Sequence, residues 1–162
     1  AVDLLGYGQA PNVEFTANFR LEQELPRIIN AVEQLALSRP VQLVGHSYGG
    51  AVALKLALEK PFKIADVVVY EPVAFHVLPD DSPGMLEIQE ISHAMNGKDA
   101  VECTRTFVDY WNDAGYFDAV AEALSTILPD VQRDSVGAGH MGPLTYPADA
   151  NQRILQFLRK QS

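Results

Sequence analysis

The sequence has 162 residues, 48% of them hydrophobic, which suits one soluble globular domain with its own core. Its 12 basic and 21 acidic residues give a formal charge of −9, which would repel nucleic acid phosphates and anionic membrane surfaces. A single cysteine excludes an intrachain disulfide, and no apolar run reaches the roughly 18 residues needed to span a bilayer, so we expect a cytoplasmic protein.

Hydrophobic periodicity in the first half of the chain predicts alternating strands and helices. Residues 1–5 form a short apolar run before a glycine turn, and we expect a buried strand there. Residues 25–36 have the spacing of an amphipathic helix. Residues 41–44, 51–60 and 64–70 then predict strand, helix and strand. This order predicts an α/β fold with a mostly parallel sheet and helices on both faces.

Residues 73–116 break this alternation, and we interpret them as a helical cap inserted into a single domain of residues 1–162. Loop signals precede two helical stretches at residues 85–95 and 99–111. Four residues of the second stretch could line a pocket, but we favour a role in packing the cap against the core. They are Phe107, Val108, Tyr110 and Trp111. The aromatic residues of the whole cap are Phe75, Phe107, Tyr110, Trp111 and Tyr116.

The last part of the chain returns to the earlier alternation. Residues 117–128 have helical spacing, residues 131–136 are a candidate last strand, and apolar residues within 154–158 predict a closing helix. A glycine-rich loop separates the strand from that helix.

Gly45, Ser47 and Gly49 form a G-x-S-x-G pattern between a predicted strand and a predicted helix, the context of a nucleophile elbow. Such a turn lifts the serine hydroxyl above the sheet, and we expect its strained backbone to leave no space for side chains at Gly45 and Gly49. The following helix directs its N-terminal amides at developing negative charge. The alternative is a tight connection with no catalytic role.

His140 lies on the glycine-rich loop, after the last predicted strand. A serine hydroxyl is a poor nucleophile at neutral pH unless a base accepts its proton, and a near-neutral imidazole is suited to that task. Without the elbow we would prefer a solvated loop histidine. The other three histidines, His46, His76 and His93, show no metal-ligand spacing with one another or with Cys103, so we expect no metal.

These motifs resemble the α/β-hydrolase superfamily, in particular its capped bacterial members. Four segments carry the likeness in the order that the superfamily shows: residues 3–8, 44–50, 69–72 and 137–147. The resemblance implies a hydrolase that acts on an ester, or a related acyl or carbon–carbon bond, through an acyl-enzyme and without a cofactor. It implies Ser47 as nucleophile, His140 as base, and the Tyr48 amide as half of an oxyanion hole.

Some parts of the superfamily pattern have no counterpart in this sequence. They are the first strands, the loop that gives the second oxyanion donor, and the strand that usually carries the catalytic acid. We therefore expect a longer protein, with junctions before Ala1 and near residues 112–117.

The acid is accordingly open. Glu71 ends a central strand, from which some members take their acid. We nevertheless favour a role for Glu71 in ending the strand and entering the cap. Asp118 suits a helix N-terminus, and Asp130 and Asp134 read as solvated.

Two alternatives share this fold. One is a degenerate homologue that acts as a binding module, and the other is a cofactor-free haloperoxidase or perhydrolase that uses the same triad. Cap composition hints at a small-molecule substrate with an apolar or aromatic acyl group. The sequence does not determine the oligomeric state.

Overall fold

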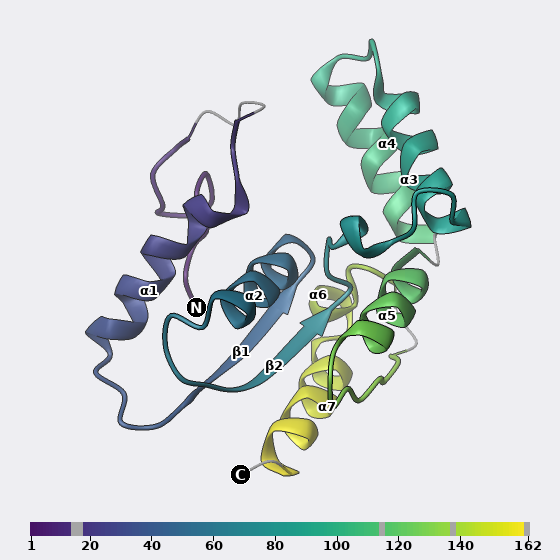
Figure 1. Ribbon diagram of the computed structural model, residues 1–162. Helices are drawn as coiled ribbons and strands as arrows, with labels where there is room; N and C mark the ends of the chain where they lie inside the picture. The colour runs from purple at the N-terminus through teal and green to yellow at the C-terminus, as the bar shows by residue number, and fades with distance from the viewer. Residues whose placement is uncertain (14–17, 114–115, 137–138, 161–162) are drawn as a thin grey trace. The chain divides into compact units, whose positions relative to one another are not determined.

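A computed structural model of the chain describes residues 1–13, 18–113, 116–136 and 139–160. The chain forms two compact units, residues 1–70 and 71–160, and each is described by itself (Figure 1). Residues 114–115, within a predicted junction, and 137–138, in the histidine loop, lie outside the described residues. Within the described ranges, no helix combines the length and apolarity that crossing a membrane requires.

The N-terminal unit contains a strand, a helix and a second strand. β1 (Val41–His46) and β2 (Ile64–Tyr70) pair in parallel, and α2 (Tyr48–Glu59) connects them. Lys60 caps the end of the helix, with a left-handed φ of 51° and an N–H that donates to the Leu56 carbonyl at 2.9 Å. The predicted strands and helix are confirmed, with the helix beginning three residues earlier than predicted.

The core of this unit joins α2 to the elements that precede β1. η1 (Leu21–Glu24) is a short 3₁₀ turn that leads into α1 (Leu25–Gln34), which confirms the predicted helix. Apolar side chains from α1 and α2 form one buried cluster, against which Leu43 of β1 packs. Burying each such side chain contributes about 1.5–3 kcal/mol. The buried members are Leu25, Ile28, Val52 and Leu56.

Two predicted strands are wrong. Residues 1–5 are irregular and lead into turns, and residues 131–136 have no regular secondary structure. A strand needs a neighbour for its backbone hydrogen bonds, and the sheet in the described residues consists of β1 and β2. The Asp3 carboxylate instead accepts from the Gln9 N–H at 2.9 Å, and the Asp134 carboxylate from the Ser135 N–H at 2.8 Å. Such local contacts compete with strand pairing.

The C-terminal unit is helical over most of its described length. Four of its helices, α3, α4, α5 and α7, confirm those predicted from periodicity, whereas the short η2 and α6 were not predicted. α3 and α4 pack against each other within the predicted cap, residues 73–116 (Figure 1). The elements are η2 (Phe75–Val77), α3 (Pro83–Met95), α4 (Ala100–Asp113), α5 (Tyr116–Ile127), α6 (Gly142–Thr145) and α7 (Pro147–Lys160).

Side-chain caps explain where the two cap helices begin. The Ser82 hydroxyl accepts from the Met85 N–H at 3.2 Å, at the start of α3. The Asp99 carboxylate accepts from the N–H groups of Val101 and Glu102, each at 2.9 Å, at the start of α4. These bonds satisfy N–H groups that have no acceptor within the helix. With the parallel sheet, the helices give the incomplete α/β fold expected from the sequence.

Candidate active site

Ser47 lies on a sharp turn between β1 and α2, with φ 54° and ψ −121°. A positive φ is costly for a residue other than glycine and persists only where neighbouring contacts impose it. Here the Ser47 N–H donates to the Tyr70 carbonyl at 3.0 Å, and the Ser47 carbonyl accepts from the Gly50 N–H at 2.9 Å. The strained backbone predicted for an elbow is therefore present at Ser47.

The two elbow glycines differ in what surrounds them. A Cβ atom added to Gly45 would lie 2.7 Å from the Gly50 Cα, so the close approach of α2 to β1 requires glycine there. A Cβ added to Gly49 would meet no heavy atom of the described residues within 4 Å. The steric prediction is confirmed for Gly45 and wrong for Gly49, because a Cβ on Gly49 would point into open space among the described residues.

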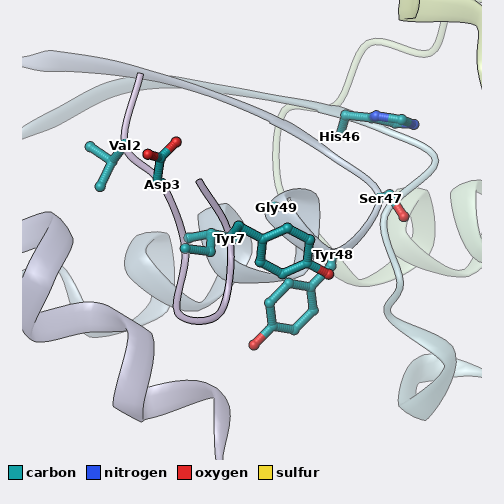
Figure 2. A pocket seen from close by; sticks show the side chains of 8 residues that line it. Val2, Asp3, Tyr7, His46, Ser47, Tyr48 and Gly49 are labelled. Atoms are coloured by element: carbon teal, nitrogen blue, oxygen red, sulfur yellow. The ribbon is translucent and has the colours of Figure 1, made fainter. Parts of the chain in front are cut away.

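Beside Ser47 the N-terminal unit has a pocket of about 390 Å³. Figure 2 shows Ser47 and His46 at one end of it, Val2 and Asp3 at the other, and the rings of Tyr7 and Tyr48 between them. The pocket therefore joins the predicted nucleophile to a mainly apolar and aromatic wall. Its lining residues are Val2, Asp3, Leu4, Tyr7, His46, Ser47, Tyr48 and Gly49.

Tyr48 is the first residue of α2, so its backbone N–H is among those that have no acceptor within their own helix. Its side chain packs against the core cluster, and its hydroxyl donates to a carboxylate oxygen of Glu24 at 3.1 Å. Burial raises the pKa of Tyr48, and the hydrogen bond to the Glu24 carboxylate raises it further. Tyr48 is thus held in its neutral form.

The sequence analysis missed Glu24, although the helical spacing of the apolar residues that follow it could have indicated that its side chain is buried. Glu24 lies four residues before Ile28, on the apolar face that α1 continues. A charged residue on that face points to a buried polar contact rather than to a solvated one. The Glu24 carboxylate also accepts from the Leu5 N–H at 2.9 Å.

In the C-terminal unit, His140 and Glu71 contact each other directly. His140 Nδ1 lies 2.8 Å from Glu71 Oε2, although the two residues are 69 positions apart in the sequence. The His140 side chain is 8% exposed and that of Glu71 is 23% exposed. Bonded to a carboxylate through Nδ1–H, an imidazole keeps Nε2 as its proton acceptor.

An aromatic side chain of the cap lies beside His140. The Trp111 ring lies 6.0 Å from the His140 ring, and Phe75 stacks on Trp111 at 5.5 Å with an interplanar angle of 6°. Glu71 follows β2 directly and, like Ser47, has a positive φ, which is 43°. The buried His140 differs from the solvated loop histidine that was the alternative in the sequence analysis.

The other candidate acids make contacts away from His140 or are solvated. Asp134 pairs with Arg153 at 2.7 Å. The Ser135 N–H lowers the pKa of Asp134, and Arg153 lowers it further. Asp118 lies in the first turn of α5, and both Asp118 and Asp130 are exposed. Among these carboxylates, the described contacts bring Glu71 to His140.

The remaining histidines lie where a packing or solvated role was expected. The His46 ring meets the Tyr70 ring edge-on at 5.7 Å, and His76 and His93 are exposed. Within the described part of the chain, no group of three His, Cys, Asp or Glu side chains could hold a metal ion.

The sequence matches the model of the alpha/beta hydrolase family over residues 1–156. The chain belongs to the alpha/beta hydrolase family. It is also 35% identical over 72 residues to Lipase LipV of Mycobacterium tuberculosis. That alignment covers 44% of this chain and 26% of the lipase, so the chain matches about a quarter of this relative's length. The resemblance stated from the four sequence segments is confirmed.

Proposed function

We propose that this hydrolase-family chain is a serine hydrolase that cleaves an ester, or a related acyl or carbon–carbon bond, through an acyl-enzyme on Ser47. His140 is the general base, Glu71 is the acid that orients it, and the Tyr48 N–H is one donor to the oxyanion. Ser47 belongs to the N-terminal unit, and His140 and Glu71 belong to the C-terminal unit, so their joint action is part of the proposal.

In the proposed reaction, His140 Nε2 takes the proton of Ser47 Oγ as that oxygen bonds to the substrate carbonyl carbon. The Tyr48 N–H donates to the carbonyl oxygen as it becomes negative. His140 then gives the proton to the leaving group, and the acyl group stays on Ser47. A water molecule, deprotonated by His140, attacks the acyl carbon, and the proton returns to Ser47 Oγ as the acid leaves.

The hydrogen bond between His140 Nδ1 and Glu71 Oε2 is the observation that carries this proposal. A carboxylate at Nδ1 fixes the tautomer that leaves Nε2 as the base, and it stabilises the imidazolium formed during the reaction. The low exposure of His140 excludes bulk water from most of this bond, which strengthens it. The positive φ of Ser47 adds support from the N-terminal unit.

The substrate that we propose is a small molecule with an apolar or aromatic acyl group. The pocket beside Ser47 offers Val2, Leu4 and Tyr7 to such a group. Its Asp3 carboxylate disfavours an anionic substrate. The partial relative is a lipase by name, which agrees with an ester substrate. A cytoplasmic location remains a prediction from the sequence.

The test is the intact mass of the protein before and after reaction with a serine-directed fluorophosphonate. We expect one adduct per chain, and none on the Ser47→Ala variant. A folded wild-type protein without an adduct would contradict the proposal and favour the non-catalytic alternative. Turnover of a short-chain ester with and without peroxide would identify the perhydrolase alternative, which requires peroxide as the acceptor.

A further inference from the structure

Glu24 is a carboxylate with 0% exposure at the end of η1. Its Oε1 accepts from the Tyr48 hydroxyl at 3.1 Å, and its Oε2 accepts from the Leu5 N–H at 2.9 Å. Leu25 and Ile28, which follow it, both belong to the buried apolar cluster. A buried charge at the margin of such a cluster is unfavourable unless its hydrogen bonds compensate for lost hydration.

The two donors to Glu24 belong to two different segments that contribute to the pocket lining. Tyr48 begins α2 directly after Ser47, whereas Leu5 belongs to the segment that contributes Leu4 and Tyr7 to the pocket lining (Figure 2). One carboxylate therefore joins the helix that starts at the elbow to the segment that faces it. Arg27 adds a second link to this segment, because its Nε donates to the Asp3 carbonyl at 2.9 Å.

The backbone around Tyr48 is held from a second direction. Gly45 allows β1 to approach the Gly49–Gly50 peptide closely, because a Cβ at position 45 would lie 2.7 Å from the Gly50 Cα. That contact fixes the helix start against the strand, and the Tyr48 side chain fixes it against η1. Between them these contacts limit the rotation of the peptide that carries the Tyr48 N–H.

We propose that Glu24 is a positioning residue, which holds the Tyr48 N–H at the angle needed by the oxyanion and keeps the facing segment in place. The inference rests on the proposed function, because only that function makes the Tyr48 N–H an oxyanion donor whose orientation matters. Glu24 touches no substrate in this role and acts through Tyr48. An N–H donor that is already oriented before the reaction stabilises the transition state more than it stabilises the bound substrate.

The experiment measures how the rate of Ser47 labelling by a fluorophosphonate saturates with reagent concentration, together with the urea midpoint of unfolding. Glu24→Ala should lower the maximal rate constant about tenfold, while the half-saturating concentration changes by less than about twofold. Glu24→Gln should return the rate to within about twofold of wild type, since its amide oxygen can accept from Leu5 and its amide nitrogen can donate to Tyr48.

Two control variants separate positioning from stability. Glu22→Ala removes a glutamate from the same 3₁₀ turn, but Glu22 is exposed and pairs with Lys55 at 2.8 Å. Ile28→Val trims the core cluster and should lower the urea midpoint. Neither variant should change the maximal rate constant of labelling.

A maximal rate unchanged in folded Glu24→Ala, or reduced equally in Ile28→Val, would overturn the proposal. If Glu24→Ala does not fold, Tyr48→Phe tests the same contact, because it removes the hydroxyl that donates to Glu24 and keeps the ring. Its maximal rate constant of labelling should fall in the same way. Absence of labelling in wild-type protein would instead overturn the proposed function, and the positioning role with it.

Discussion

The elbow and the histidine pair are held in place by different means. Backbone contacts fix Ser47, through its bonds to the Tyr70 and Gly50 peptides and the close approach at Gly45. A side-chain hydrogen bond fixes His140, and its partner lies 69 residues away. The elbow depends on the absence of a side chain at Gly45, and the position of His140 depends on the carboxylate of Glu71. Substitutions at the two places should therefore fail in different ways.

Loss of the Glu71 charge should have the largest effect, and it should fall on activity. Glu71→Gln keeps the size of the side chain but can present an amide N–H₂ to His140 Nδ1, which favours the wrong tautomer. We expect ester turnover to fall about 10³-fold, with a change in the urea midpoint that is small by comparison.

The control for this variant is Asp134→Asn, which also removes one carboxylate charge from the C-terminal unit. Asp134 pairs with Arg153 rather than with His140. Its substitution should leave turnover unchanged. Equal turnover in Glu71→Gln and wild type would show that His140 does not depend on Glu71.

Substitution of Gly45 should act on stability. Gly45→Ala places a methyl group 2.7 Å from the Gly50 Cα, and the resulting shift of α2 from β1 should cost about 1–3 kcal/mol or more. Urea unfolding measures this cost.

Gly49→Ala is the matched comparison, since its added methyl group meets no described heavy atom within 4 Å. Alanine favours the helix over glycine by about 0.5–1 kcal/mol, so this variant should be at least as stable as wild type. Equal destabilisation by both alanines would contradict the geometry described at the elbow.

The smallest expected effect concerns the pH dependence of stability at Tyr48. The folded protein raises the pKa of this phenol above its usual value of about 10, so the neutral phenol is the favoured form in the fold. The resulting stability is fully present below the unfolded pKa and is lost as pH rises toward the folded pKa.

Wild type should therefore lose stability relative to Tyr48→Phe only above about pH 10, as followed by urea midpoints. Tyr146→Phe, at an exposed tyrosine, is the control and should show no such difference from wild type. A constant gap between wild type and Tyr48→Phe from pH 7 to 11 would contradict the raised pKa of Tyr48, to which burial contributes most and the hydrogen bond to Glu24 contributes next.

Local patterns in the sequence predicted most of the fold, because helices depend on near neighbours. The spacing around Ile28 and the glycine at position 45 were sufficient to place α1 and the elbow. Strands depend on distant partners, and for that reason the predictions of strands at residues 1–5 and 131–136 were wrong. The contact of Glu71 with His140, and that of Glu24 with Tyr48, have the same long-range character. No local pattern specifies either pair.

The positive φ angles of Ser47 and Glu71 have a consequence for directed evolution of this chain. Strain of this kind costs on the order of 1–3 kcal/mol at each residue, and glycine relieves it. Selection for heat resistance alone should therefore favour glycine at both positions. Under the proposed function, both substitutions remove a residue that the reaction needs, so the most heat-resistant variants would be inactive unless activity is selected in the same screen.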